Sequence, residues 1–452
     1  MRVEIDAKGG YRRALTTRTH ARWWVLAATC AVALIGPATA IATPTPPSQD
    51  PFYSYEGSRP LKRIAPGTVL KTRTTSYNVV GIPLPVTAVQ LLYRTTNQLG
   101  KPAVNVTSVL LPPAPAATPT VVSYQSFYDS LTNEDDPSYA ISGGVSFGGL
   151  IPDFEAGLIA APLLQGDTVV VPDTEGENAD FAAGPEYGLN TIDSLRAALS
   201  SPATGLAGTQ KVGLIGYSGG AIATEWAAEL APSYAPELNS KIVGVAFGGT
   251  LVDPAHNLRY VEGSSVWAGV IPMGLIGIAR AFDVNLTRYM TPYGQELNTK
   301  LQHASITEVL GQYPGLTWAQ IAKPQYPTPE SVPVYVKVAN QLIMGTRGTP
   351  TEPLLIGQGN GGELEGTSGD KPGIGPGDGV MIAGDVRSLA REYCSRGVTL
   401  EFKEYEHLGH IAGAGAWASE AYTWLDERFD GTAAPQNCSS IAAGNSIEPL
   451  PK

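Results

Sequence analysis

The apolar residues of this chain gather in short runs that alternate with longer stretches in which apolar positions recur at helical spacing. Short runs bounded by Gly, Pro or Asp are typical of buried strands, and the longer stretches are typical of amphipathic helices. The predicted helices include residues 189–199, a segment directly after residue 218, and residues 417–429. The predicted strands are residues 79–82, 88–93, 104–111, 120–124, 168–171, 212–215, 241–247, 353–357 and 399–405. This alternation predicts an α/β fold with a mostly parallel, doubly wound sheet.

The N-terminal 40 residues have the pattern of an export signal. Four arginines, at positions 12, 13, 18 and 22, precede the apolar run 23–36, and the small-residue sequence 37–40 follows. This is the order of the n-region, h-region and cleavage site of a secretory signal, and the run is short for a membrane span. A membrane anchor is the alternative. We expect residues 1–40 to be a signal peptide, residues 41–60 to be an extended Pro-rich leader, and the mature protein to be secreted or to stay in the cell envelope.

Composition limits the partners and the redox setting. The 452 residues are 43% hydrophobic, enough for a large core in one oversized domain or two smaller ones. Without residues 1–40 the chain has 24 Lys+Arg against 39 Asp+Glu, a formal charge of −15. That charge disfavours nucleic acid and anionic membranes as partners. Cys394 and Cys438 remain as a pair in an exported chain, and we expect a disulfide between them; two free thiols are the alternative.

The sequence Gly216-Tyr217-Ser218-Gly219-Gly220 follows the predicted strand 212–215 and precedes a helical segment. This G-x-S-x-G arrangement is a nucleophile elbow, in which small neighbours make room for a serine on a strained turn. The following helix directs its free N–H groups toward the place where an oxyanion would form. A second match, centred on Ser146, lacks a preceding buried strand and is interpreted as a loop. The motif around Ser218, between a predicted strand and a helix, therefore predicts a serine hydrolase.

Residues 252–347 interrupt the strand and helix alternation and are too many for a simple connection. Helical patterns occupy residues 266–282, 295–310 and 317–322. In hydrolases of this architecture such an insertion forms a cap, and its apolar residues, Trp267 and Ile271 among them, could cover a lipid-binding cleft. An ordinary packed helical subdomain is the alternative. The expected organisation is a core of residues 61–251 and 348–432, a cap or lid of residues 252–347, and a C-terminal tail of residues 433–452.

The candidate base comes from four histidines outside the signal. His256 and His303 fall in the insertion, whereas His407 and His410 follow the last predicted strand, 399–405, where the base of this class lies. His410 is preferred over His407 because it follows Gly409, and a Gly-His turn lets the ring swing over the elbow to accept the serine proton.

The chain also resembles a known family. Its motifs are similar to those of the fungal secretory lipases of the lipase A type and their exported actinobacterial relatives. The resemblance spans roughly residues 60–430 and implies an α/β-hydrolase fold with a helical lid, and hydrolysis of triglycerides or other esters through Ser, Asp and His. It also implies an oxyanion hole formed by the backbone N–H groups of Gly219 and Asp129; a helix-capping loop aspartate is the alternative for Asp129. The matching residues are Tyr124-Gln125-Ser126, Asp129-Ser130, Leu214 to Gly220, Glu404-Tyr405 and Gly409-His410.

The acid is harder to place, because a glycine-rich run, 358–377, follows the strand at which the family carries its aspartate. The sequence from Gly377 onward fits the family pattern, and this similarity favours Asp378 over Glu363, Asp370 and Asp385. A plain Asp-Gly turn is the alternative.

Together these residues predict a carboxylic ester hydrolase. His410 would take the Ser218 proton during attack on an ester carbonyl, and Asp378 would orient the imidazole. A serine peptidase or amidase, an acyltransferase and a non-catalytic exported binding protein are the alternatives. The expected partner is a lipid or ester substrate, including esters at a lipid–water interface, with no cofactor and no metal.

Overall fold

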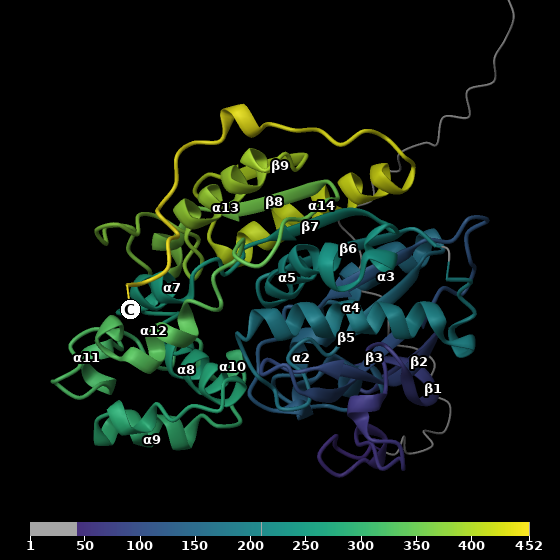
Figure 1. The fold of residues 1–452 in the computed structure, drawn as a ribbon, viewed down its shortest axis with the longest axis horizontal. Helices are drawn as coiled ribbons and strands as arrows, with labels where there is room; N and C mark the ends of the chain where they lie inside the picture. The colour runs from purple at the N-terminus through teal and green to yellow at the C-terminus, as the bar shows by residue number, and fades with distance from the viewer. Residues whose placement is uncertain (1–42, 209, 452) are drawn as a thin grey trace, which may run out of the picture. The chain divides into compact units, whose positions relative to one another are not determined.

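The computed structural model describes residues 43–208 and 210–451, and the predicted signal peptide lies outside these residues. Within them, nine strands form one sheet in the spatial order β1-β2-β3-β5-β4-β6-β7-β8-β9 (Figure 1). The strands from β5 to β9 along this order pair in parallel, and β1, β2 and β3 add an antiparallel extension at one edge. The strands are β1 (Val69–Val79), β2 (Ile82–Thr96), β3 (Pro102–Leu111), β4 (Val121–Gln125), β5 (Thr168–Pro172), β6 (Val212–Tyr217), β7 (Ile242–Gly248), β8 (Leu354–Gly359) and β9 (Leu400–Tyr405).

Helices cover both faces of this sheet, which explains why the central strands are continuously apolar. Successive side chains of a strand point to opposite faces, so Leu214 belongs to the apolar cluster on one face of the sheet, while its neighbour Ile215 belongs to the cluster on the other face. The helices of this core are α1 (Pro137–Ile141), α2 (Leu150–Phe154), α3 (Ala156–Gln165), α4 (Gly184–Ser200), α5 (Gly219–Tyr234), α6 (Pro236–Asn239), α13 (Ala383–Ser395) and α14 (His410–Phe429). The result is an α/β-hydrolase fold, as the sequence predicts.

A second apolar cluster is formed mainly by the chain between β7 and β8. Its helices are α7 (Pro254–Val261), α8 (Val270–Ala281), α9 (Pro292–Lys300), α10 (Ile306–Val309), α11 (Trp318–Ile321) and α12 (Pro333–Ala339). The single helix expected over residues 295–310 is wrong. The chain leaves α9 after Lys300, and Ser305 starts α10 with a capping box closed by Glu308. Ser305 also pairs with Ser130 in an isolated bridge, which ties the break to the core.

The strand expected over residues 79–82 is also wrong. This apolar stretch contains the turn between β1 and β2, where Val80 (φ 49°) and Gly81 (φ 72°) both adopt left-handed backbone angles. Two consecutive positive φ angles give the turn whose twist matches a two-residue hairpin. The edge strand β1 was missed because most of its residues are polar and only partly buried.

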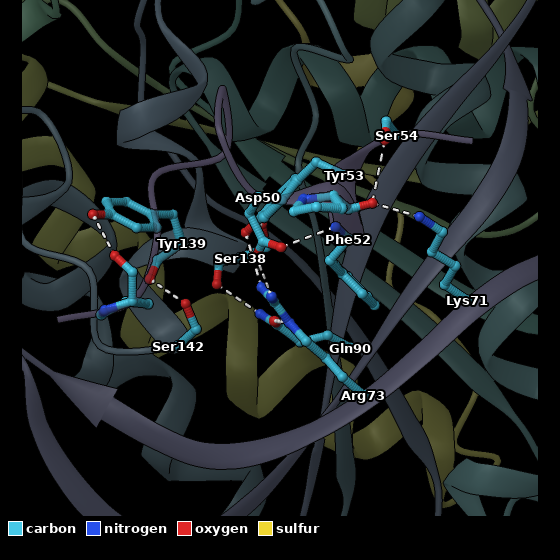
Figure 2. A network of polar contacts seen from close by, with 12 residues as sticks. Asp50, Phe52, Tyr53, Ser54, Lys71, Arg73, Gln90, Ser138, Tyr139 and Ser142 are labelled. Atoms are coloured by element: carbon cyan, nitrogen blue, oxygen red, sulfur yellow. Dashed lines mark hydrogen bonds and ion pairs between the residues drawn. The ribbon is translucent and has the colours of Figure 1, made fainter. Parts of the chain in front are cut away.

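The segment that precedes β1 is anchored to the sheet by Arg73 of β1. Figure 2 shows the Arg73 guanidinium bonded to the Asp50 carboxylate and to Gln90 Oε1, the latter at 2.6 Å. The same guanidinium lies 4.1 Å from the ring centre of Phe52, in the short 3-10 helix Pro51–Tyr53. Tyr53 is hydrogen-bonded to Ser138 of α1 at 3.0 Å. These contacts hold the start of the described chain against the core.

The C-terminal tail is attached to the core along its length. Cys394 at the end of α13 forms a disulfide with Cys438. Further along, Asn340 after α12 donates a hydrogen bond to the carbonyl of Leu450 at 2.9 Å. No helix in the described part of the chain is long and apolar enough to cross a membrane.

Candidate active site

Ser218 lies on the tight turn between β6 and α5. Its backbone has φ 53° and ψ −121°, a strained conformation for a residue with a side chain. The turn requires both flanking glycines. A Cβ at Gly216 would lie 2.4 Å from the carbonyl oxygen of Gly220, and a Cβ at Gly220 would lie 2.1 Å from the carbonyl oxygen of Gln125. The local sequence therefore determines a turn that lifts Ser218 out of the sheet at the start of a helix.

Three side chains form a hydrogen-bonded row at this turn. His410 Nε2 lies 2.7 Å from Ser218 Oγ, and His410 Nδ1 lies 2.8 Å from Asp378 Oδ2. The Asp378 side chain is fully buried and the His410 residue is 5% exposed. A backbone hydrogen bond also joins these two residues, because the His410 N–H donates to the Asp378 carbonyl at 2.7 Å. The structure thus brings together the serine, histidine and aspartate that the sequence singles out.

The Asp378 carboxylate is held by four donors or potential donors. The N–H groups of Val380 and Met381 donate to Oδ1 at 3.1 and 2.7 Å. Gln358 Nε2 donates to Oδ2 at 3.0 Å, beside His410 Nδ1. Gln358 is fully buried at the end of β8, a role that sequence reasoning missed, although its place directly after a predicted strand was a usable signal.

The glycine-rich run does not displace Asp378, because it closes on itself. The N–H of Gly362 donates to the carbonyl of Gly377 at 2.8 Å, so the chain leaves the end of β8 and returns to it. The other candidate acids lie elsewhere: Glu363 and Asp370 are exposed, and Asp385 pairs with His256 at 3.0 Å.

The remaining histidines and the second serine motif lie away from the row. His407 is exposed, and its N–H donates to Asn360 Oδ1 at 2.7 Å. His303 is exposed as well. Ser146 lies in a loop, where its hydroxyl donates to Asp135 Oδ1 at 2.6 Å. None of these three side chains has a contact with Ser218 among the described residues.

The surroundings of His410 favour its charged form. Burial lowers the pKa of the imidazole, but the Asp378 charge and hydrogen bond raise it, and the carboxyls of Glu365 and Asp129 act in the same direction. The net shift of the His410 pKa is upward. An imidazolium formed by proton transfer from Ser218 would therefore be stabilised where it arises.

Asp129 lies next to the serine turn. A Cβ built on Gly219 would lie 2.1 Å from Asp129 Oδ1, so this carboxyl abuts one of the two expected oxyanion donors. Burial raises the pKa of Asp129 to about 7, against the opposing effect of His410. Asp129 Oδ1 is buried and has no hydrogen-bond partner among the described residues. A protonated Asp129 side chain is therefore a second potential donor, beside the backbone N–H that the sequence comparison suggests.

An apolar cavity of about 90 Å³ opens from Ser218 and Asp129 into the helical insertion. More than half of its lining residues come from the insertion, and α7 and α8 contribute more of them than any other helix. The lining includes Leu258, Val261, Trp267, Ile271, Leu275 and Ile278. Among the described residues, no group of three or more His, Cys, Asp or Glu side chains is placed to hold a metal ion.

The fold and the placement of a serine at the strand–helix turn define the chain as an α/β-hydrolase. It belongs to the secretory lipase family, which matches residues 144–371 and 374–437. Lipase 4 of Candida albicans is 31% identical over 418 residues, which are 90% of this chain and 86% of the relative. A Mycobacterium tuberculosis protein described as a probable inactive lipase is 31% identical over 395 residues, 86% of this chain and 83% of the relative. The solved structure of Candida antarctica lipase A superposes with a TM-score of 0.74 at 26% identity and covers 91% of this chain and 92% of its own.

Proposed function

We propose that the protein is an active, exported serine esterase of the lipase type, with Ser218 as nucleophile, His410 as base and Asp378 as the group that orients His410. The observation that carries the proposal is the unbroken row from Ser218 Oγ to Asp378 Oδ2, with separations of 2.7 and 2.8 Å, at the mouth of an apolar cavity. Both distances are within hydrogen-bond reach for proton transfer.

The steps of hydrolysis follow from this geometry. His410 Nε2 accepts the Ser218 proton as Oγ attacks the ester carbonyl, and Asp378 keeps the proton of Nδ1 in place. The N–H of Gly219, the first residue of α5, and a donor of Asp129 stabilise the oxyanion. His410 then protonates the leaving alcohol, and a water activated by the same imidazole releases the acid.

The substrate class follows from the cavity and the insertion. Its walls are mainly aliphatic, and the carboxyl that lines it, Asp129, has a pKa raised by burial. Such a wall suits the acyl part of an ester and lacks the charged groups that would fix a peptide. We assign residues 252–347 as the cap over this cavity, because this segment supplies more than half of its lining residues.

One relative is described as a probable inactive lipase, so activity has to be tested directly. The experiment is hydrolysis of p-nitrophenyl esters with acyl chains of increasing length by the protein without residues 1–40. We expect turnover, with kcat/KM rising with chain length while the acyl group fills the cavity. A wild-type protein that turns over none of these esters would contradict the proposal, and cleavage of anilides in preference to esters would favour an amidase.

A further inference from the structure

Glu365 links the helical insertion to the start of α14, where His410 lies. It is the last residue of the short 3-10 helix Gly362–Glu365 in the glycine-rich run, and it is half-buried. Its Oε1 accepts the N–H of Ile411 at 2.9 Å, and its Oε2 accepts the indole N–H of Trp267 at 3.1 Å. Trp267 lies just before α8, and Ile411 is the second residue of α14. One carboxylate thus holds a residue of the insertion and the residue next to His410.

The neighbours of this carboxylate belong to both loops of the proposed triad. A Cβ at Gly409 would lie 2.4 Å from Glu365 Oε1, and a Cβ at Gly379 would lie 3.1 Å from Glu365 Cβ. Gly409 precedes His410 and Gly379 follows Asp378. The Trp267 ring also meets the His410 ring edge-on, with 5.3 Å between their centres. The Glu365 side chain is therefore packed between the loops that set the His410 orientation.

The charge of Glu365 acts on the same imidazole. A carboxylate is favoured at a helix N-terminus, and Glu365 accepts a hydrogen bond from the first turn of α14. Burial and the charge of Asp378 raise the pKa of Glu365, whereas the Ile411 N–H, the charge of His410 and the Trp267 N–H lower it, and the net shift is upward. The titratable groups that face His410 among the described residues are the carboxyls of Asp378, Glu365 and Asp129, which all raise its pKa, and the Tyr217 side chain of β6. The Tyr217 ring centre lies 5.0 Å from that of His410, and burial raises the pKa of its hydroxyl, which donates to the His410 carbonyl.

We propose that Glu365 is a positioning residue, which uses one carboxylate to hold His410 in line with Ser218 and to couple that alignment to the cap through Trp267. The proposal rests on the proposed function, since it concerns the same hydrolysis. It distinguishes Glu365 from Glu363, an exposed residue of the same short helix.

The test is a set of variants assayed on a short soluble p-nitrophenyl ester across pH. Glu365→Ala loses both hydrogen bonds, so kcat should fall about 10- to 100-fold while KM changes less than about twofold. Glu365→Gln keeps the shape, and with its amide oxygen at the Ile411 N–H it keeps that acceptor, but it removes the charge and the acceptor for the Trp267 N–H. Its kcat/KM should fall a few-fold, and the acid limb of its pH profile should move down by roughly half a pH unit, because a nearby negative charge no longer favours the imidazolium.

Coupling to the cap is measured with Trp267→Phe, which removes the indole N–H but keeps an aromatic edge against His410. The combined loss in Glu365→Gln/Trp267→Phe should be smaller than the product of the single losses, because both changes break the same hydrogen bond. Glu363→Gln is the matched control and should behave as wild type. If Glu365→Ala does not fold, Glu365→Gln and Trp267→Phe decide the matter.

Two results would overturn the inference: an acid limb in Glu365→Gln that coincides with wild type, or single losses that multiply in the double variant. Ser218→Ala in the same assay distinguishes a failure of the role of Glu365 from a failure of the proposed function. Loss of turnover in Ser218→Ala with wild-type behaviour of Glu365→Gln rejects the role of Glu365 alone. Retained turnover in Ser218→Ala rejects the proposed function.

Discussion

Replacing Asp378 by Asn tests the orienting role of this carboxyl, and the structure predicts how the variant fails. Asn Oδ1 would keep the two hydrogen bonds from the N–H groups of Val380 and Met381. The amide nitrogen would then occupy the position of Oδ2, where it faces His410 Nδ1 and Gln358 Nε2. An N–H donor there forces His410 to accept at Nδ1 and to carry its proton on Nε2, so it cannot take the proton of Ser218.

The expected loss in kcat is about 10⁴-fold, equivalent to about 5.5 kcal/mol of transition-state stabilisation. Folding should be preserved, because Gln358 Oε1 is buried without a partner among the described residues and can accept from the new amide after a rotation of its side chain. The assay is p-nitrophenyl ester turnover on proteins with matched thermal midpoints. Asp370→Asn, at an exposed position of the same segment, is the control and should be silent. Turnover of Asp378→Asn within tenfold of wild type, or a collapse of turnover in Asp370→Asn, would mean that Asp378 does not orient His410.

Three further predictions concern stability and pH. Replacing Cys394 and Cys438 by Ser removes a crosslink with a sequence separation of 44, which should stabilise the fold by roughly 4 kcal/mol through loop entropy. The thermal midpoint of this variant should therefore fall by about 4 °C while its turnover stays unchanged. A midpoint equal to that of wild type would argue against the crosslink. Burial, and then the charge of Glu229, raise the pKa of Glu225 in the folded protein, so this group costs stability as pH rises above its unfolded pKa. Calorimetry should therefore find Glu225→Gln more stable than wild type by about 1 kcal/mol at pH 8 and no more stable than wild type near pH 4. A difference in unfolding free energy that stays the same at both pH values would contradict this linkage. The base must be neutral to accept the serine proton, and the pKa of His410 is raised. The acid limb of the pH profile of kcat/KM should therefore lie above about pH 6.5, the ordinary range of a histidine. An acid limb well below that pH would contradict the raised pKa of His410.

The parts of the fold that were predictable from sequence are those set by local patterns. The parallel strands are buried on both faces and are therefore continuously apolar, and the turn at Ser218 needs glycines that the sequence displays. The edge strand β1 lacks such a pattern, because most of its side chains are only partly buried. The break between α9 and α10 has a local signal that the apolar periodicity concealed, the capping box of Ser305 and Glu308, whereas the pairing of Ser305 with Ser130 has none.

The same distinction applies to the candidate site. The local sequence of glycines around Ser218 is enough to predict the turn there. The position of Asp378 instead depends on a glycine-rich run whose two ends are joined by the hydrogen bond between Gly362 and Gly377. The contacts of Glu365 cross from this run to the insertion and to α14, so spacing along the chain could not indicate them. Family resemblance supplied the choice of Asp378 where the local pattern was ambiguous.

Covalent labelling shows whether Ser218 is the nucleophile of an active ester hydrolase. The wild-type protein, Ser218→Ala and Ser146→Ala are treated with a fluorophosphonate, analysed by peptide mass spectrometry, and assayed for p-nitrophenyl ester hydrolysis. The account predicts a label on Ser218 in the wild type and in Ser146→Ala, and no label with a loss of turnover of at least about 10⁴-fold in Ser218→Ala. A label on Ser146, or ester turnover by Ser218→Ala at the wild-type rate, would contradict it.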